Sequence, residues 1–201
     1  MKEMSKATNK TVFSTKQMVV LALLSALAYV LMLFPFPIKF LGFLELEFSD
    51  VPAIIATLSY GPIGGVVVEL IKNVIKAMTA STTAGIGELA NFVIISAYMV
   101  PLGILFRKLK TRHKAVVSFV VAVLGFVIAG IIVNYFVTVP LYAKLFGGID
   151  NVVGAAAATI PAIKDLATVV IIGITPFNVV KGILISVTGY AAYKAFYRVI
   201  K

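Results

Sequence analysis

Six apolar runs, separated by charged residues or by Gly and Pro, limit most strongly what this chain can fold into. A helix needs about 20 apolar residues to cross a bilayer. The runs cover residues 15–34, 50–60, 62–78, 86–106, 115–139 and 168–197. Hydrophobic residues make up 61% of the 201-residue chain and charged residues 13%, whereas soluble domains have about 45–50% and about 25%. We therefore predict an all-α integral membrane protein, and exclude a water-soluble enzyme or a nucleic-acid-binding domain.

The second run, residues 50–60, is too short to span a bilayer alone. Ser49 and Asp50 are suited to cap a helix, and Pro52 is tolerated in a first turn. The run ends in Tyr-Gly-Pro at 60–62, which predicts a tight turn. We expect residues 50–78 to form a helical hairpin with a short first arm. The alternative is one broken span, which would leave five transmembrane helices.

The basic residues orient the predicted bundle. The net charge is +10, and most of the 18 Lys and Arg residues fall before residue 17, in the stretch 107–114, or after residue 193. Cytoplasmic loops of membrane proteins are enriched in Lys and Arg. Six transmembrane helices place all three segments on one side, so we predict cytoplasmic N- and C-termini. The chain is then one membrane domain, residues 1–201, that crosses the cell membrane several times and retains its first span.

The two outer loops of this topology, residues 35–49 and 140–167, are long and partly apolar. The run Gly-Ala-Ala-Ala-Ala at 154–158 predicts a short helix on the outer surface. One interpretation is a lid over an outward-facing cavity. The other is that these loops anchor in the lipid headgroups, and composition does not separate the two.

Few residues suited to catalysis or metal binding are present. The chain has no Cys, and its single histidine, His113, lies in the basic 107–114 segment. No cluster resembles a metal site, no catalytic constellation is visible, and the P-loop sequence is absent. We predict a protein that is not an enzyme, has no cofactor and depends on another subunit for any use of ATP.

Polar residues within the spans are costly in lipid, so each one indicates a partner or a cavity. On the third helix Glu69, Lys72, Asn73 and Lys76 share one face. Because Glu69 and Lys72 are three residues apart, we predict a structural ion pair between them. Lys76 lies near the outer end of the helix, where it can reach the interface.

A second polar set converges on the outer half of the bundle. It consists of Glu88, Asn91, Asn134, Asn178 and Lys181. Each residue alone is explained by bonding between helices, but together they predict a polar binding pocket. All three arginines lie in the predicted cytoplasmic segments. A phosphate or carboxylate usually selects a guanidinium, so the set fits a neutral ligand with many hydrogen-bonding groups.

Small residues on the first helix indicate a close helix contact. Ala22 and Ala26 have the small-x-x-x-small spacing that lets two helices approach. Spacing alone favours packing inside the chain's own bundle. Contact with another protein is the alternative.

Five motifs resemble a known family. They are Leu-Glu-Phe-Ser-Asp-Val-Pro-Ala at 46–53, Tyr-Gly-Pro at 60–62, Val-Glu-Leu-Ile-Lys-Asn at 68–73, Gly-Ile-Gly-Glu-Leu-Ala-Asn-Phe at 85–92 and Asn-Val-Val-Lys-Gly at 178–182. Together they resemble the substrate-binding (S) components of energy-coupling factor (ECF) transporters, and among these the riboflavin-specific group. The resemblance covers nearly the whole chain in length, span count and motif order.

The resemblance implies six helices and one vitamin bound near the outer face under the first outer loop. It implies ligand contacts from Glu88, Asn134, Asn178 and Lys181, and from Asn91, Leu46 and Phe48. It further implies that Ala22 and Ala26 contact a transmembrane coupling subunit, which assembles with two cytoplasmic ABC ATPases.

The resulting hypothesis is a high-affinity riboflavin-binding subunit of an ECF vitamin uptake transporter. Riboflavin is neutral, and an Asn amide can match the donors and acceptors of its pyrimidine edge. One alternative is an S component for another vitamin, such as thiamine or pantothenate. Another is a stand-alone carrier that couples to an ion through Glu69 or Glu88.

Overall fold

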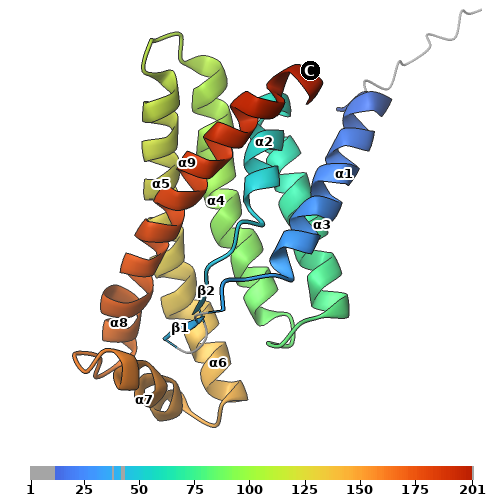
Figure 1. Cartoon of the computed structure of the whole chain (residues 1–201). Helices are drawn as coiled ribbons and strands as arrows, with labels where there is room; N and C mark the ends of the chain where they lie inside the picture. Colours follow the sequence, from blue (N-terminus) through green and yellow to red (C-terminus); the bar gives the residue numbers. More distant parts are fainter. Residues whose placement is uncertain (1–11, 38, 42–43, 201) are drawn as a thin grey trace, which may run out of the picture.

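Helices run lengthwise through the molecule and pack side by side (Figure 1). The computed structural model describes residues 12–37, 39–41 and 44–200; Lys2, Lys6, Lys10 and Lys201, used above for orientation, lie outside the described residues. The helices of the bundle are α1 (Thr15–Met32), α2 (Val51–Tyr60), α3 (Pro62–Thr79), α4 (Ile86–Lys108), α5 (Lys114–Val133) and α9 (Thr175–Ile200). The remaining elements are β1 (Lys39–Phe40), β2 (Leu44–Glu45), α6 (Val139–Leu145), α7 (Ile149–Thr159) and α8 (Leu166–Thr168).

Two π-helical segments interrupt the last two long helices. The segment η1 (Asn134–Thr138) joins α5 to α6, and η2 (Val169–Ile174) joins α8 to α9. A π-turn inserts an extra residue and changes which side chains face inward, and such turns are frequent at functional sites. Both segments lie toward the same end of the bundle as β1 and β2 (Figure 1).

The observed helices extend the predicted runs in two places. The fifth run was expected to end at 139, but α5, η1 and α6 continue without a break to Leu145, and Pro140 lies just after the π-helical segment η1. The expected short helix at 154–158 is part of the longer α7. The region 140–167 is therefore mostly helical, not an open loop.

Apolar side chains cover the outside of the bundle. Val120, Leu124 and Ile128 on α5 are each more than half exposed, which fits a lipid environment and not water. Among the described residues, four segments are long and apolar enough to cross a membrane: Thr15–Met32, Ile86–Lys108, Lys114–Leu145 and Leu166–Arg198. The chain is thus a helical membrane protein.

Helices α2 and α3 do not meet the criterion of length and composition, for separate reasons. Helix α2 has only 10 residues, and the 18 residues of α3 include three charged ones, Glu69, Lys72 and Lys76. The two helices pack against each other and are joined at Gly61, where the predicted turn occurs.

The two ends of the bundle differ in what they carry. The start of α1, the turn between α4 and α5 and the end of α9 lie together at one end (Figure 1). The strands, α6, α7 and α8 lie at the other. An apolar core of α1, α2, α4 and α5 residues fills the middle, and a smaller cluster forms the second end around Tyr142, Val170 and Ile174.

Gly61 is required by the turn between α2 and α3. Its φ is +92°, and a Cβ atom there would lie 2.5 Å from the Arg107 guanidinium. We expect Gly61→Ala to destabilise the protein by about 1–3 kcal/mol, seen as a lower melting temperature in detergent. Gly154→Ala is the control, since a Cβ in this part of α7 meets nothing within 4 Å. Equal melting temperatures for the two variants would contradict this account.

Candidate ligand-binding site

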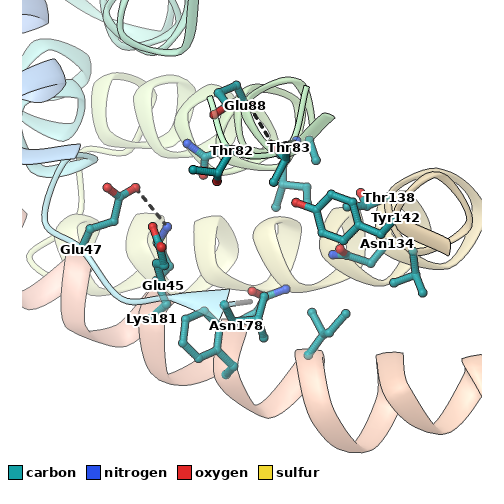
Figure 2. A pocket seen from close by; sticks show the side chains of 18 of the residues that line it. Glu45, Glu47, Thr82, Thr83, Glu88, Asn134, Thr138, Tyr142, Asn178 and Lys181 are labelled. Atoms are coloured by element: carbon teal, nitrogen blue, oxygen red, sulfur yellow. Dashed lines mark hydrogen bonds and ion pairs between the residues drawn. The ribbon is translucent and has the colours of Figure 1, made fainter. Parts of the chain in front are cut away.

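A cavity of about 360 Å³ opens at the end of the bundle that carries the strands. This volume is within the range of small-molecule sites, about 300–1,000 Å³. Its walls come mainly from α3, α4, η1, α6 and α9, with single residues from α1, α5 and η2. The described part of residues 35–49 (35–37, 39–41 and 44–49), here named the capping loop, forms a further wall. Figure 2 shows polar side chains from these elements arranged around one common space.

Five of the residues expected at a pocket line this cavity. They are Glu88 and Asn91 on α4, Asn134 in η1, and Asn178 and Lys181 on α9. They come from three elements far apart in the sequence, and the fold brings them together. Asn134, Asn178 and Lys181 are part of the cavity wall. Each is at least 92% buried, so these side chains are largely shielded from bulk water.

The capping loop contributes different residues from those expected. Leu46 and Phe48 do not line the cavity, whereas Leu44, Glu45 and Glu47 do. The Phe48 ring instead packs edge-on against Phe36 at 5.6 Å. Leu44 and Glu45 are neighbours in the chain and both line the cavity, so simple alternation along the loop does not select the lining residues. A role for Leu46 and Phe48 as ligand contacts stays a prediction.

Two asparagines meet at Gly130 on α5. The Asn134 amide donates a hydrogen bond to the Gly130 carbonyl at 2.7 Å. A Cβ on Gly130 would lie 2.5 Å from the Asn178 amide nitrogen, so only glycine leaves room for that side chain. Within the described part of the chain the Asn178 amide has no hydrogen-bond partner, which leaves its donors and acceptor for a ligand.

The turn between α3 and α4 orients Glu88. Its carboxylate accepts hydrogen bonds from the Ser81 hydroxyl at 2.9 Å and the Thr83 hydroxyl at 3.1 Å. Gly87 lets Thr83 and Tyr142 approach, since a Cβ there would lie 2.9 Å from each hydroxyl. Sequence reasoning missed Tyr142 because it was assigned to an outer loop, whereas it is on α6 and lines the cavity.

Behind the cavity lies a group of buried charges. Lys72 forms an ion pair with Glu69 at 2.8 Å, the pair expected from their spacing. It forms a second at 2.6 Å with Asp50, which the sequence did not indicate. Lys181 lies 3.2 Å from the other oxygen of Asp50 and 4.0 Å from Glu47 (Figure 2 shows the latter contact).

Glu47 presents an unused acceptor in this group. Its Oε2 atom is buried and, among the described residues, has no hydrogen-bond partner. Burial raises the pKa of the Glu47 carboxyl above its ordinary value, and the nearby Lys181 ammonium opposes the shift. Glu47 lines the cavity, but this oxygen atom is itself buried and does not face the cavity space.

Apolar contacts hold the capping loop on the bundle. Leu41 is fully buried in the cluster at this end of the molecule. Its side chain occupies the space above Gly173, where a Cβ would lie 2.6 Å from it. The neighbouring Phe40 ring stacks on Phe177 of α9 at 5.8 Å. The loop is therefore docked over the cavity, and is not spread along an outer surface.

Ala22 and Ala26 lie away from the cavity. Both are on the exposed side of α1, while Leu21, Ser25 and Ala28 face the bundle. Spacing alone favoured packing of these two alanines inside the chain's own bundle. In the structure they do not pack there. Their face is open to a partner or to lipid.

The fold and the cavity together define a helical membrane protein with a polar, ligand-sized site under a docked loop. Comparison with known proteins gives the family. Residues 16–193 match the model of the family described as "ECF transporter, substrate-specific component". This chain belongs to that family.

Curated relatives match over most of their length. The riboflavin transporter FmnP of Bacillus subtilis (strain 168) is 39% identical over 177 residues, covering 86% of this chain and 87% of the relative. The riboflavin transporter RibU of Staphylococcus aureus (strain TCH60) is 31% identical over 180 residues, covering 89% of each. A solved structure titled "Structure and mechanism of the S component of a bacterial ECF transporter" is 28% identical. It aligns with a TM-score of 0.70 over 92% of this chain and 98% of that one.

The docking of the capping loop can be tested without a ligand. We expect Leu41→Ala to weaken docking by about 2–5 kcal/mol, because it leaves a void in the apolar cluster. Trypsin should then cut faster after Lys39 in the loop, as followed by mass spectrometry. Leu33→Ala, at a residue 40% exposed, is the control and should leave the rate unchanged. Equal cleavage rates for both variants would show that Leu41 does not hold the loop.

Proposed function

We propose that this chain is the riboflavin-binding subunit of an ECF-type vitamin uptake transporter. The observation that carries the proposal is the similarity, over 86–89% of this chain, to relatives named riboflavin transporters. A cavity lined by asparagine amides supports it. The chain itself performs no reaction and needs no cofactor in this role. Riboflavin is its transported ligand.

The chemistry of the cavity suits a flavin. The pyrimidine edge of the ring alternates carbonyl acceptors with an N–H donor, and the Asn134 and Asn178 amides offer both kinds of group. The apolar xylene end fits against Ile94, Phe126 and Val139 in the wall. The hydroxyl groups of the ribityl chain both donate and accept hydrogen bonds.

We assign these hydroxyl groups to the charged part of the wall. Glu88 and Lys181 are the proposed contacts, with Asn91 beside them. Leu46 and Phe48, which the resemblance also implied as contacts, act in this scheme through the packing of the capping loop. Glu47 takes their place at the cavity.

The proposed topology has six transmembrane helices, with both termini in the cytoplasm of a bacterial cell. The cavity then opens at the outer face of the plasma membrane. Supporting this orientation, Arg107, Arg112 and Arg198 are on segments at the end of the bundle opposite the cavity (Figure 1). Basic residues favour the cytoplasmic side.

In the proposed mechanism the vitamin enters from outside and the capping loop closes over it. Because the chain has no P-loop, ATP is bound by partners, namely two cytoplasmic ABC ATPases joined through a transmembrane coupling subunit. Their cycle drives a reorientation that opens the site inward. Ala22 and Ala26 form the contact with the coupling subunit.

The first experiment is a titration of the chain, purified alone in mild detergent, with riboflavin. We expect saturable quenching of flavin fluorescence at one ligand per chain. A folded protein that neither carries a flavin nor quenches one would overturn the vitamin assignment, and thiamine and pantothenate would be titrated next.

The site assignment rests on Asn178. We expect Asn178→Ala to weaken riboflavin binding by about 1–3 kcal/mol, because a polar edge of the ligand loses its partner. Gly130→Ala should weaken it as well, by pushing the same amide aside. Both are measured by the titration, with melting temperature as the test of folding. Unchanged affinity in Asn178→Ala would remove this residue from the site.

The partner surface can be tested separately. Ala22→Trp and Ala26→Trp are expected to leave riboflavin binding intact but to block uptake by the assembled transporter, since a bulky side chain prevents close helix approach. Val120→Trp is the control, on the exposed face of α5. Normal uptake with either alanine variant would place the contact with the coupling subunit elsewhere.

A further inference from the structure

Lys72 is fully buried in α3 and does not line the cavity. Its ammonium donates hydrogen bonds to Asp50 Oδ1 at 2.6 Å and to Ser49 Oγ at 3.0 Å. It also forms an ion pair with Glu69 Oε2 at 2.8 Å. Lys72 therefore acts on the cavity through its neighbours.

Two of these neighbours lead directly to the cavity. The Ser49 hydroxyl accepts from Lys72 and donates to Glu47 at 2.9 Å. Asp50 uses one carboxylate oxygen for Lys72 and the other for Lys181, at 3.2 Å. Glu47 and Lys181 both line the cavity, the first from the capping loop and the second from α9.

The third neighbour leads to the cavity through one more residue. The Asn73 side-chain amide donates a hydrogen bond to Glu69 Oε2 at 3.3 Å, and Asn73 Oδ1 accepts one from the Asn91 side-chain amide at 3.1 Å. Asn91 lines the cavity from α4. One buried ammonium is thus connected to three separate walls of the site.

We propose that Lys72 is a positioning residue that sets the affinity for the ligand without touching it. Through Ser49, Asp50 and Asn73 it holds the polar groups of three cavity walls in one arrangement. This inference rests on the proposed function, since riboflavin is the ligand used to measure it.

Two physical effects support this role. The contacts of the Lys72 ammonium with Asp50, Glu69 and Ser49 hold these three residues in one arrangement, and a site whose groups are already in place loses less entropy on binding. In addition, Lys72 neutralises part of the charge on Asp50. Without Lys72, the Lys181 ammonium, which lies 3.2 Å from Asp50, would be the main partner of that carboxylate. Lys181 would then be held more tightly by Asp50 and would be less available to the cavity, because a buried carboxylate requires a partner.

The branch through Ser49 gives the mildest test. Ser49→Ala removes one hydroxyl and leaves the ion pairs of Lys72 in place, and it is expected to raise the riboflavin Kd about three- to tenfold. The melting temperature of the ligand-free protein should stay near that of the wild type. Ser25→Ala is the matched control, because Ser25 is equally buried and bonds only within α1. It should leave the Kd unchanged.

A double-mutant cycle separates positioning from general destabilisation. If Ser49 acts through Glu47, then Ser49→Ala should have little further effect on Kd in a Glu47→Gln background. Likewise, Asn73→Ala should have little effect in an Asn91→Ala background. The cross pair, Ser49→Ala with Asn91→Ala, belongs to different branches and should be additive. A merely structural role predicts additivity in all three pairs.

Lys72→Met tests the centre of the network and should weaken binding more than either branch variant. If that variant does not fold, the branch variants decide. The proposal is overturned if Ser49→Ala and Asn73→Ala bind like the wild type, or if their losses follow a lowered melting temperature. Wild-type protein that fails to bind riboflavin would overturn the proposed function, and the positioning role with it. Tight wild-type binding with unaffected branch variants would overturn the positioning role alone.

Discussion

The burial of the Lys72 ammonium is the constraint on which the rest of this structure depends. Moving such a charge out of water is unfavourable by several kcal/mol unless it is paired and fully hydrogen-bonded. Its partners come from the start of α2 and from α3 itself. The α2–α3 hairpin, the last residues of the capping loop and, through Asp50, α9 must therefore keep one arrangement. These charges would be unfavourable in a membrane protein if they were unpaired. Their pairing fixes where α2, α3, α9 and the capping loop meet.

The cavity follows from this arrangement together with the irregular helices around it. The segments η1 and η2 bring Asn134 and Ile174 to the cavity wall, and the absence of a side chain at Gly130 admits Asn178. Leu41 closes the other side through apolar packing. Polar pairing of Ser49 and apolar packing of Leu41 hold the capping loop against the bundle, so the loop forms one wall of the cavity.

Much of this could be read from the sequence because membranes penalise polar groups. Asn91, Asn134, Asn178 and Lys181 stand out in apolar runs, and all four line the cavity. The Glu69–Lys72 pair follows from local helical spacing. Glu47 lines the cavity and was not indicated by the sequence, because nothing local to a loop determines which side chains turn inward.

The sequence by itself determined that this protein lies in a membrane, where its helices fall, and which polar residues need a partner. These depend on hydrophobicity and on contacts within one or two turns. Only the tertiary structure decided that Asp50 pairs with Lys72, that Leu41 packs over Gly173, and that Ala22 faces outward. Each depends on the distance between segments far apart in the chain, and helix packing, not local preference, sets that distance.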